Sequence, residues 1–338
     1  MAAKRPAFWQ QRSGWALLLW PVSLIFLVLS SLRRVCYRQG VLKSRRSAVP
    51  VVVVGNIAVG GSGKTPVVVW LASALEARGW SPGIVSRGYG RKDDAIRIVA
   101  SGDTPASVGD EPRLLAQLTG VPVVVGADRP EAIRHLLAAC PAVDVVISDD
   151  GLQHLAMARD AQVVVLDEQV LGNGWLLPAG PLREPITRLG EASVLVVHGS
   201  VSDKLMARLP DVPQVSMTLD GTHFEAISNR AERRCAADFS GCRVHAVAGI
   251  GRPERFFDQL RAMGLDVVPH PFPDHHDYVP ADLAFEPGEP ILLTEKDAVK
   301  CAAFAPADTW VFPVRARISE AALQPILDSL DRHGRQAA

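Results

Sequence analysis

Short runs of apolar, mostly β-branched residues recur from residue 50 onward and alternate with stretches of helical periodicity. The runs occupy residues 51–54, 121–125, 143–147, 162–166 and 193–197. They are almost continuously hydrophobic, as expected of parallel strands that are covered on both faces. Helices are expected around 65–78, 112–119 and 130–139. The pattern predicts an α/β fold in which helices cover both faces of a mostly parallel sheet.

A second, smaller α/β domain is predicted toward the end of the chain. Residues 200–240 are more polar and less periodic, and the strand-and-helix pattern resumes after them. Strands are expected at 244–249, 266–269, 290–293 and 309–313, and helices at 253–263 and 318–331. From composition we place a first domain at 49–235 and the smaller one at 236–338. A cleft between two such domains is the expected place for a substrate.

A long uncharged segment precedes both domains. Residues 13–32 read SGWALLLWPVSLIFLVLSSL, and a helix of about 20 apolar residues can cross the core of a bilayer. Trp15 and Trp20 suit a membrane interface. No small-residue cleavage site follows, so we expect the segment to be retained as an anchor within residues 1–48. A helix lying in one leaflet, favoured by the interruption at Pro21, and a buried core helix are the alternatives.

Basic residues flank the uncharged segment unequally. Before it stand Lys4, Arg5 and Arg12, and after it stand Arg33, Arg34, Arg38, Lys43, Arg45 and Arg46. Because cytoplasmic flanks carry the excess of Lys and Arg, the bulk of the protein is predicted to face the cytoplasm. The same cluster would attract anionic membrane lipids.

The overall composition excludes several classes of protein. The chain has 36 Lys plus Arg and 36 Asp plus Glu, so its net charge is zero and nothing indicates a nucleic-acid partner. None of the five cysteines forms a C-x-x-C pair. A zinc site and a disulfide framework are therefore not expected.

The segment VVVVGNIAVGGSGKTP, residues 51–66, predicts a phosphate-binding loop. A buried strand, a Gly-rich loop and a helix start follow one another, which is the context that this motif needs. Ala58 stands where the pattern G-x-x-x-x-G-K-[ST] has its first glycine, and we expect Gly60 and Gly61 to supply the missing freedom. The predicted nucleotide-binding residues are Ala58, Val59, Gly60, Gly61, Ser62, Gly63, Lys64 and Thr65.

Lys64 and Thr65 have the more specific chemistry within this loop. We expect Lys64 to reach the β- and γ-phosphates and the Thr65 hydroxyl to hold Mg²⁺. A phosphate loop needs a further acid, and VDVVISDDGLQH supplies Asp149 and Asp150 directly after the strand at 143–147. Acids at that end of a strand lie on the ligand side of an open α/β sheet. An ordinary Asp-Gly turn is the alternative.

Two further segments carry candidate proton-transfer groups. Asp110, in GDEPRLLAQLTG, is either a helix N-cap or a general base for an acceptor hydroxyl. HPFPDHHDY, residues 270–278, brings histidines and aspartates together, which suits proton transfer better than structural zinc. Histidines on a surface loop without such a role are the alternative.

Three shorter motifs are less specific. In GPLREP, residues 180–185, Arg183 could offset charge on a transferred phosphoryl group and Glu184 could help to bind Mg²⁺, although an ordinary surface pair explains them equally well. SRGYGR, residues 86–91, is compatible with phosphate contact. TEKD, residues 294–297, is interpreted as a helix capping box.

Taken together and in this order, the motifs resemble those of the tetraacyldisaccharide 4'-kinases of lipid A biosynthesis. The matching pieces are the N-terminal apolar helix, GNIAVGGSGKTP, SRGYGR, GDEP, DDGLQH, GPLREP, FPDH and LLTEKDAVK. They extend from about residue 10 to about residue 300. The family also lacks the first glycine of the phosphate loop, so Ala58 fits the resemblance.

The resemblance implies a P-loop kinase at the inner membrane that depends on ATP and Mg²⁺. Its acceptor would be the 4'-hydroxyl of a tetraacylated glucosamine disaccharide 1-phosphate, and its product lipid IVA. It implies a catalytic pair of Asp110 and His275, with His276 as a rival for the second position. It also assigns metal and phosphate roles to Lys64, Thr65, Asp149, Asp150 and Glu184.

Two other functions remain open from the residues alone. A membrane-anchored P-loop switch would bind and hydrolyse nucleotide to control a partner protein. A P-loop kinase for a soluble metabolite would leave the apolar segment unexplained.

Overall fold

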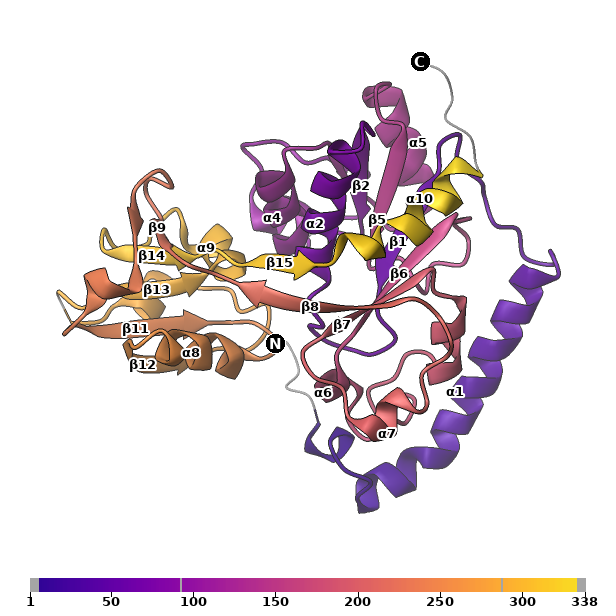
Figure 1. The fold of residues 1–338 in the computed structure, drawn as a ribbon, viewed down its shortest axis with the longest axis horizontal. Helices are drawn as coiled ribbons and strands as arrows, with labels where there is room; N and C mark the ends of the chain where they lie inside the picture. Colours follow the sequence, from indigo (N-terminus) through magenta and orange to yellow (C-terminus); the bar gives the residue numbers. More distant parts are fainter. Residues whose placement is uncertain (1–5, 92, 287, 333–338) are drawn as a thin grey trace.

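Two β-sheets, seen in Figure 1, organise the fold of the computed structural model, which describes residues 6–91, 93–286 and 288–332. Within these residues the larger sheet has the strand order β15-β8-β7-β6-β1-β5-β2-β4-β3. Its strands are β1 (Val51–Gly55), β2 (Pro82–Ser86), β3 (Arg97–Ile98), β4 (Val123–Val125), β5 (Val145–Asp149), β6 (Ala161–Leu166), β7 (Val194–His198), β8 (Gln214–Asp220) and β15 (Arg315–Ile318). Only its outer strands β3 and β15 pair antiparallel with their neighbours.

Helices cover both faces of the larger sheet, as the hydrophobic pattern predicts. On one face α2 (Lys64–Glu76), α4 (Asp110–Thr119) and α10 (Gln324–Asp331) pack into a single apolar cluster with the strands. On the other face α5 (Arg129–Ala139) packs into a second cluster. The strands β1 and β5 lie side by side at the centre and are buried throughout. This prediction of fold class is confirmed.

The smaller sheet forms the core of a second unit. Its order is β10-β9-β14-β13-β11-β12 among the described residues. The strands are β9 (Phe224–Ala226), β10 (Arg233–Arg234), β11 (Arg243–Ala248), β12 (Asp266–Pro271), β13 (Ile291–Thr294) and β14 (Thr309–Phe312), and the helices are α8 (Pro253–Ala262) and α9 (Glu295–Cys301). Phe224 is fully buried between Phe239 and Phe312, with ring centroids 5.1 and 5.0 Å away.

The remaining helical segments are short. They are η1 (Ala7–Trp9), α3 (Pro105–Val108), α6 (Glu168–Leu171), η2 (Ile186–Glu191), α7 (Asp203–Met206), η3 (Ala236–Phe239), η4 (Pro280–Leu283) and η5 (Glu320–Ala322).

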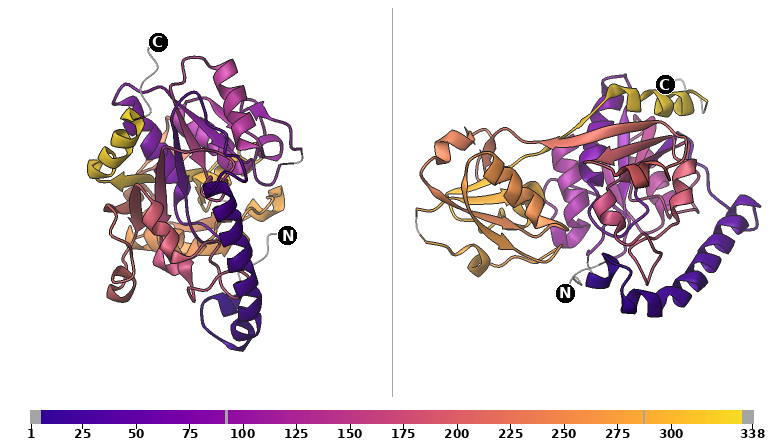
Figure 2. Two further views of the ribbon diagram at one scale, coloured as in Figure 1. Left: turned by 90° about the vertical axis from the view of Figure 1, so that its right-hand side faces the viewer. Right: turned by 60° about the horizontal axis from the view of Figure 1, so that its bottom comes forward.

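The division of the chain between the two units differs from the expected boundary at 235/236. Strands β9 and β10 precede that boundary but belong to the smaller sheet, and β15 and α10 follow it but belong to the larger one. The helix expected at 318–331 is divided into η5 and α10, because β15 extends to Ile318 and pairs with β8. These two paired strands carry the chain between the units (Figures 1 and 2).

The apolar segment forms α1 (Gly14–Arg38), the helix in the described residues that is long and apolar enough to cross a membrane. Only Ala16 and Ser23 of this helix are buried, so the alternative of a buried core helix is wrong. The helix extends along the larger-sheet unit rather than away from it (Figure 2). Of its basic flank, Lys4 and Arg5 lie outside the described residues.

Candidate active site

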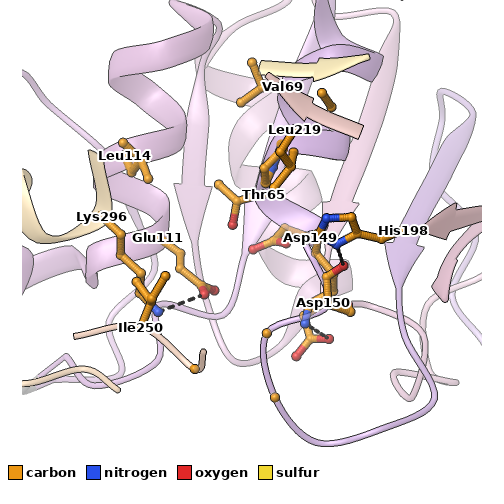
Figure 3. A pocket seen from close by; sticks show the side chains of 18 of the residues that line it. Thr65, Val69, Glu111, Leu114, Asp149, Asp150, His198, Leu219, Ile250 and Lys296 are labelled. Atoms are coloured by element: carbon orange, nitrogen blue, oxygen red, sulfur yellow. Dashed lines mark hydrogen bonds and ion pairs between the residues drawn. The ribbon is translucent and has the colours of Figure 1, made fainter. Parts of the chain in front are cut away.

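A cavity of about 1970 Å³ lies where the two units meet. The larger-sheet unit lines it with the phosphate loop and the ends of the central strands. The smaller unit lines it with residues 250–256, 271–275 and 294–296. Figure 3 shows Thr65, Asp149 and Asp150 in this pocket together with Ile250 and Lys296 of the smaller unit. The cleft therefore lies between the two units, where a substrate was expected.

The phosphate loop follows β1 and ends at the start of α2. Gly60 and Gly63 adopt positive φ values of 113° and 89°, which an L side chain rarely tolerates. Asn56 steadies the loop, since its Nδ2 donates to the Gly60 carbonyl at 3.2 Å and to the Ser62 hydroxyl at 3.0 Å. Every residue from Val59 to Thr65 lines the cavity, and the first helical residue is Lys64.

Ala58 is placed differently from the rest of the loop. It is buried and forms an isolated β-bridge with Leu182, and it does not line the cavity. Its backbone is not in the left-handed region. The turn therefore needs glycine at positions 60 and 63 rather than at 58.

Asp149 and Asp150 face the phosphate loop from the neighbouring strand. Strand β5 ends at Asp149, two residues later than predicted, and Asp150 follows with a φ of 47°. Ser86 donates a hydrogen bond to Oδ2 of Asp149 at 2.9 Å. The other oxygen, Oδ1, of each aspartate is buried and accepts no hydrogen bond within the described part of the chain.

The two aspartates differ in charge environment. Burial, together with the carboxylates of Glu111 and Asp150, raises the pKa of Asp149 to about 7. Burial would also raise the pKa of Asp150, but the nearby cations Lys64, at 3.5 Å, and Arg183, at 3.1 Å, lower it below its ordinary value. Two carboxylates beside a phosphate loop, each with a buried oxygen that accepts no hydrogen bond in the described residues, are a donor set that fits Mg²⁺. This ion binds through one or two carboxylates and substrate phosphates.

Asp110 and His275 come together from the two different units. Oδ2 of Asp110 lies 3.0 Å from Nδ1 of His275. Asp110 is the first residue of α4, and the N-cap is Gly109, so the interpretation of Asp110 as an N-cap is wrong. His276 points elsewhere and hydrogen-bonds Asp282 at 2.9 Å. The geometry therefore selects His275 over His276 as the neighbour of Asp110.

The Asp110 carboxylate is largely enclosed. Burial would raise its pKa, but the hydrogen bond from His275 and the positive charge of Lys300, 3.7 Å away, lower the pKa below its ordinary value. His275 lines the cavity, whereas Asp110 is not among the lining side chains and keeps 15% exposure. Tyr89 of SRGYGR also lines the cavity, and its ring centroid is 5.5 Å from that of His275.

Arg183 and Glu184 are adjacent but lie in different places. Arg183 lines the cavity and pairs with Asp150. Glu184 is buried outside the cavity lining, where it pairs with Arg188 at 2.9 Å and accepts from Gln153 at 3.0 Å. The structure therefore does not bring Glu184 to the predicted metal ligands.

Several residues of the site were missed by the sequence analysis. Glu111 and Lys296 line the cavity and face each other at 3.5 Å, as the dashed line in Figure 3 shows. The capping interpretation of TEKD is correct for Thr294, whose hydroxyl accepts from the Asp297 N–H at 3.2 Å. A capping box needs only Thr294 and Asp297 of this motif, so it gives no reason to expect a role for Lys296.

A second connection between the units lies beside the phosphate loop. Asp167, at 2% exposure, accepts from Arg252 at 3.0 Å and pairs with Arg255 at 2.9 Å, and both arginines belong to the smaller unit. His198 continues the connection, because its Nδ1 lies 3.1 Å from Arg255 and 3.2 Å from the carbonyl oxygen of Ser62. Ion pairing at Asp167 therefore links the smaller unit to the phosphate loop.

The fold and the site together define a P-loop kinase. A phosphate loop follows the central strand β1, and two acids stand at the end of β5, its neighbour in the sheet. An Asp–His pair lies in reach of the same cavity. The family described as "Tetraacyldisaccharide-1-P 4'-kinase" matches residues 15–331. The chain belongs to this family.

Two relatives and a solved structure match all or nearly all of the chain. A tetraacyldisaccharide 4'-kinase from Aromatoleum aromaticum is 56% identical, and the match covers 100% of both chains. One from Azoarcus sp. is 58% identical, covering 98% of this chain and 97% of its own. The crystal structure of LpxK from Aquifex aeolicus in complex with ATP has a TM-score of 0.78 and 30% identity, and covers 94% of this chain and 99% of that one.

Proposed function

We propose that this chain transfers the γ-phosphate of ATP to the 4'-hydroxyl of a tetraacylated glucosamine disaccharide 1-phosphate, which gives lipid IVA. One observation carries the chemistry of this proposal. The phosphate loop and His275, which is bonded to Asp110, line the same cavity from opposite units. A donor phosphate and an acceptor hydroxyl bound in this cavity would meet between them. The names of the relatives support a tetraacyldisaccharide as the acceptor, and the description of the family supports its 1-phosphate.

Asp110 is the proposed general base. As the 4'-oxygen forms its bond to the γ-phosphorus, the bond from that phosphorus to the oxygen bridging the β- and γ-phosphates breaks. The hydroxyl proton passes to the Asp110 carboxylate. His275 orients this carboxylate through the hydrogen bond to Oδ2. A lowered pKa keeps Asp110 ionised and able to accept the proton at neutral pH.

Cationic and amide groups of the chain offset the charge of the phosphates. The backbone N–H groups of the loop and of the start of α2 can face the phosphate oxygens. Lys64 and Arg183, which both pair with Asp150, lie at the same end of the cavity and can stabilise charge that develops on the transferred group.

Thr65, Asp149 and Asp150 are the residues that we propose would hold Mg²⁺. The assignment is supported by Oδ1 of Asp149, which is buried and accepts no hydrogen bond from the described residues, and by Oδ1 of Asp150, which is buried, likewise accepts no hydrogen bond and lies 3.5 Å from the Lys64 ammonium. When bound, the ion would neutralise part of the charge on the β- and γ-phosphates. We leave Glu184 out of the set, because its carboxylate is paired with Arg188 outside the cavity.

The contacts of α1 support a helix that lies in one leaflet. Ahead of the helix, Trp9 of η1 donates to the Pro178 carbonyl at 2.9 Å, and in the middle of the helix Ser23 donates to the Leu176 carbonyl at 2.9 Å. Near its end Arg34 lies 3.7 Å from Glu184. A spanning helix would draw these partners, which belong to the irregular segment 176–184, into hydrocarbon that cannot satisfy their backbone groups.

This arrangement also explains how a lipid acceptor is reached. Most large apolar side chains of α1 are exposed, including Leu18 at 67% and Ile25 at 60%. Arg34 contacts Glu184, and the preceding residue, Arg183, lines the cavity. We propose that α1 inserts its exposed face into the cytoplasmic leaflet of the inner membrane, so that the cavity opens near the bound lipid.

The test is transfer of radiolabel from ATP to the lipid disaccharide by the purified protein in mixed micelles. Asp110→Ala should abolish turnover while ATP binding, measured by calorimetry, stays within about twofold of the parent. Asp277→Ala, at an exposed aspartate two residues beyond His275, is the matched control and should keep full turnover. Nucleotide hydrolysis without any transfer to lipid would instead support the switch function.

A further inference from the structure

Helix α9 presents two lysines to the Asp110–His275 pair. Lys296 and Lys300 are four residues apart, so they project from the same face of the helix about one turn apart. Thr294 caps the helix and fixes its start. The larger-sheet unit contributes Asp110 and Glu111, and the smaller unit contributes His275 and both lysines.

Lys300 lies between two carboxylates. Its side chain is only 6% exposed, and Nζ donates to the His276 carbonyl at 3.1 Å. Nζ is 3.7 Å from Oδ2 of Asp110 and 3.4 Å from Oδ1 of Asp297. Asp297 is itself held by the Gly249 N–H at 3.0 Å. The ammonium group is therefore fixed in place as the nearest full positive charge to the proposed base.

Lys296 contacts the other side of the pair. Its Nζ donates to Asp274 at 3.0 Å, lies 3.5 Å from Glu111 and is 3.3 Å from Nε2 of His275. Burial would lower the pKa of Lys296, but Glu111 and Asp274 raise it above its ordinary value, so the amine stays charged. An ammonium group has only donors, so Nε2 of His275 must accept, and the ring hydrogen is then on Nδ1.

We propose that Lys296 and Lys300 are positioning residues for phosphoryl transfer: Lys296 selects the His275 tautomer that donates to Asp110, and Lys300 keeps Asp110 ionised and in place. This inference rests on the proposed role of Asp110 as the base. It assigns the proton to Asp110 rather than to His275, because the free lone pair of that histidine is already engaged by Lys296. The charged groups that face Asp110 are His275, Lys300 and, further away, Lys296.

The first experiment measures kcat and KM against pH for Lys300→Met, Lys300→Arg and an exposed control, Lys204→Met. Loss of the Lys300 charge weakens the stabilisation of ionised Asp110. The acid limb of kcat/KM should therefore move to higher pH by about one unit in Lys300→Met. We expect kcat to fall about tenfold with the KM for ATP within about twofold. Lys300→Arg should return the limb toward that of the parent, and Lys204→Met should leave it unchanged.

The second experiment reads the tautomer directly. In the full-length protein with labelled histidine, the ¹⁵N shifts of His275 should show hydrogen on Nδ1, and Lys296→Met should give a mixture of tautomers. A parent protein with hydrogen on Nε2 would overturn the inference for Lys296. This readout does not depend on activity and remains available if Lys300→Met does not fold.

A double-substitution cycle separates this inference from the proposed function. If Lys300 acts through Asp110, Lys300→Met should cost no further activity in an Asp110→Asn background. An inactive Asp110→Asn combined with an unshifted acid limb in Lys300→Met would overturn the role of Lys300 alone. Near-normal turnover of Asp110→Asn would overturn the base assignment and this inference with it.

Discussion

Oδ2 of Asp110 lies 3.0 Å from Nδ1 of His275, although 165 positions separate these residues in the chain. Each belongs to a different sheet unit, and the two units are joined by the paired strands β8 and β15. The candidate catalytic pair therefore exists only when the units are held in this arrangement. Contacts between the units, and not only the residues at the reacting atoms, should then control turnover.

The first prediction concerns the adjacent histidines. His275→Ala removes the hydrogen bond to Asp110 and should lower kcat by a factor on the order of 10² or more, as general-base catalysis commonly contributes that much. His276→Ala breaks a contact with Asp282 and should cost less than about tenfold. Steady-state rates with the lipid acceptor check both. Equal losses in the two variants would contradict the assignment of His275.

The second prediction uses the opposite pKa shifts of two neighbouring acids. The pKa of Asp149 is raised in the folded state, so its contribution to stability is full below about pH 4 and is lost as the pH rises through about 7. At pH 8 and without nucleotide, Asp149→Asn should therefore stabilise the fold, and this gain should shrink at pH 5. Denaturant unfolding at the two pH values measures it.

Asp150 provides the control with the reverse sign. Its pKa is lowered by Lys64 and Arg183, so its contribution to stability is present above the unfolded-state pKa and lost as the pH falls through the folded-state value. Asp150→Asn should destabilise the fold at pH 8. Two variants that change stability in the same direction would show that charge environment does not explain either result.

The third prediction concerns the ion pairs at Asp167. Asp167→Ala leaves Arg252 and Arg255 without their buried carboxylate, but both arginines retain access to solvent. We therefore expect a loss of about 1–3 kcal/mol in unfolding free energy rather than the larger cost of a sealed charge. Because His198 links this cluster to the carbonyl of Ser62, the KM for ATP should also rise.

A surface pair on the same helix as Arg255 serves as the control for this effect. Asp258 contacts Arg261 at 2.9 Å, and both side chains are exposed. Asp258→Ala should change unfolding free energy by less than about 0.5 kcal/mol and leave KM unchanged. If Asp167→Ala behaved like Asp258→Ala in both measurements, the ion pairs at Asp167 would not link the units in the way proposed.

The sequence predicts the central sheet well, because strands such as β1 and β5 are buried on both faces and so carry a continuous apolar run. It does not predict the return of the chain to that sheet. Strand β15 has the sequence RARI, in which more and less exposed residues alternate. Four residues are too few to distinguish this pattern from the start of the following helix. Only its pairing with β8 decides the matter.

The same distinction applies within the site. Glycine spacing and Gly-Lys-Thr are local signals, so the phosphate loop can be located from sequence. For Arg183 and Glu184, nothing local tells which side chain faces the cavity, because that depends on the long-range partners Asp150 and Arg188. The lysines of α9 were missed for a related reason: their partners Glu111 and Asp110 belong to the other unit.

The fourth prediction distinguishes a helix in one leaflet from a spanning helix. Single cysteines would be placed at Ser13 and Arg38, on either side of most of α1, in a chain whose five native cysteines have been replaced. In inverted inner-membrane vesicles, which expose the cytoplasmic face, a membrane-impermeant thiol reagent should label both positions if α1 lies in the cytoplasmic leaflet. Labelling at 13 that requires detergent would mean that α1 spans.

Two further substitutions test whether the exposed face of α1 binds the membrane and whether its contact with the kinase unit matters for turnover. Ile25→Glu changes an exposed position and should weaken binding to anionic vesicles without changing the fold. Ser23→Val removes the hydrogen bonds to the Leu176 carbonyl and from the Ala179 N–H, so α1 should separate from the kinase unit. Because α1 would then hold the cavity less closely to the membrane, turnover of the lipid acceptor should fall more than vesicle binding does. If Ser23→Val reduced neither turnover nor vesicle binding, the contact of α1 with Leu176 and Ala179 would have no part in presenting the lipid.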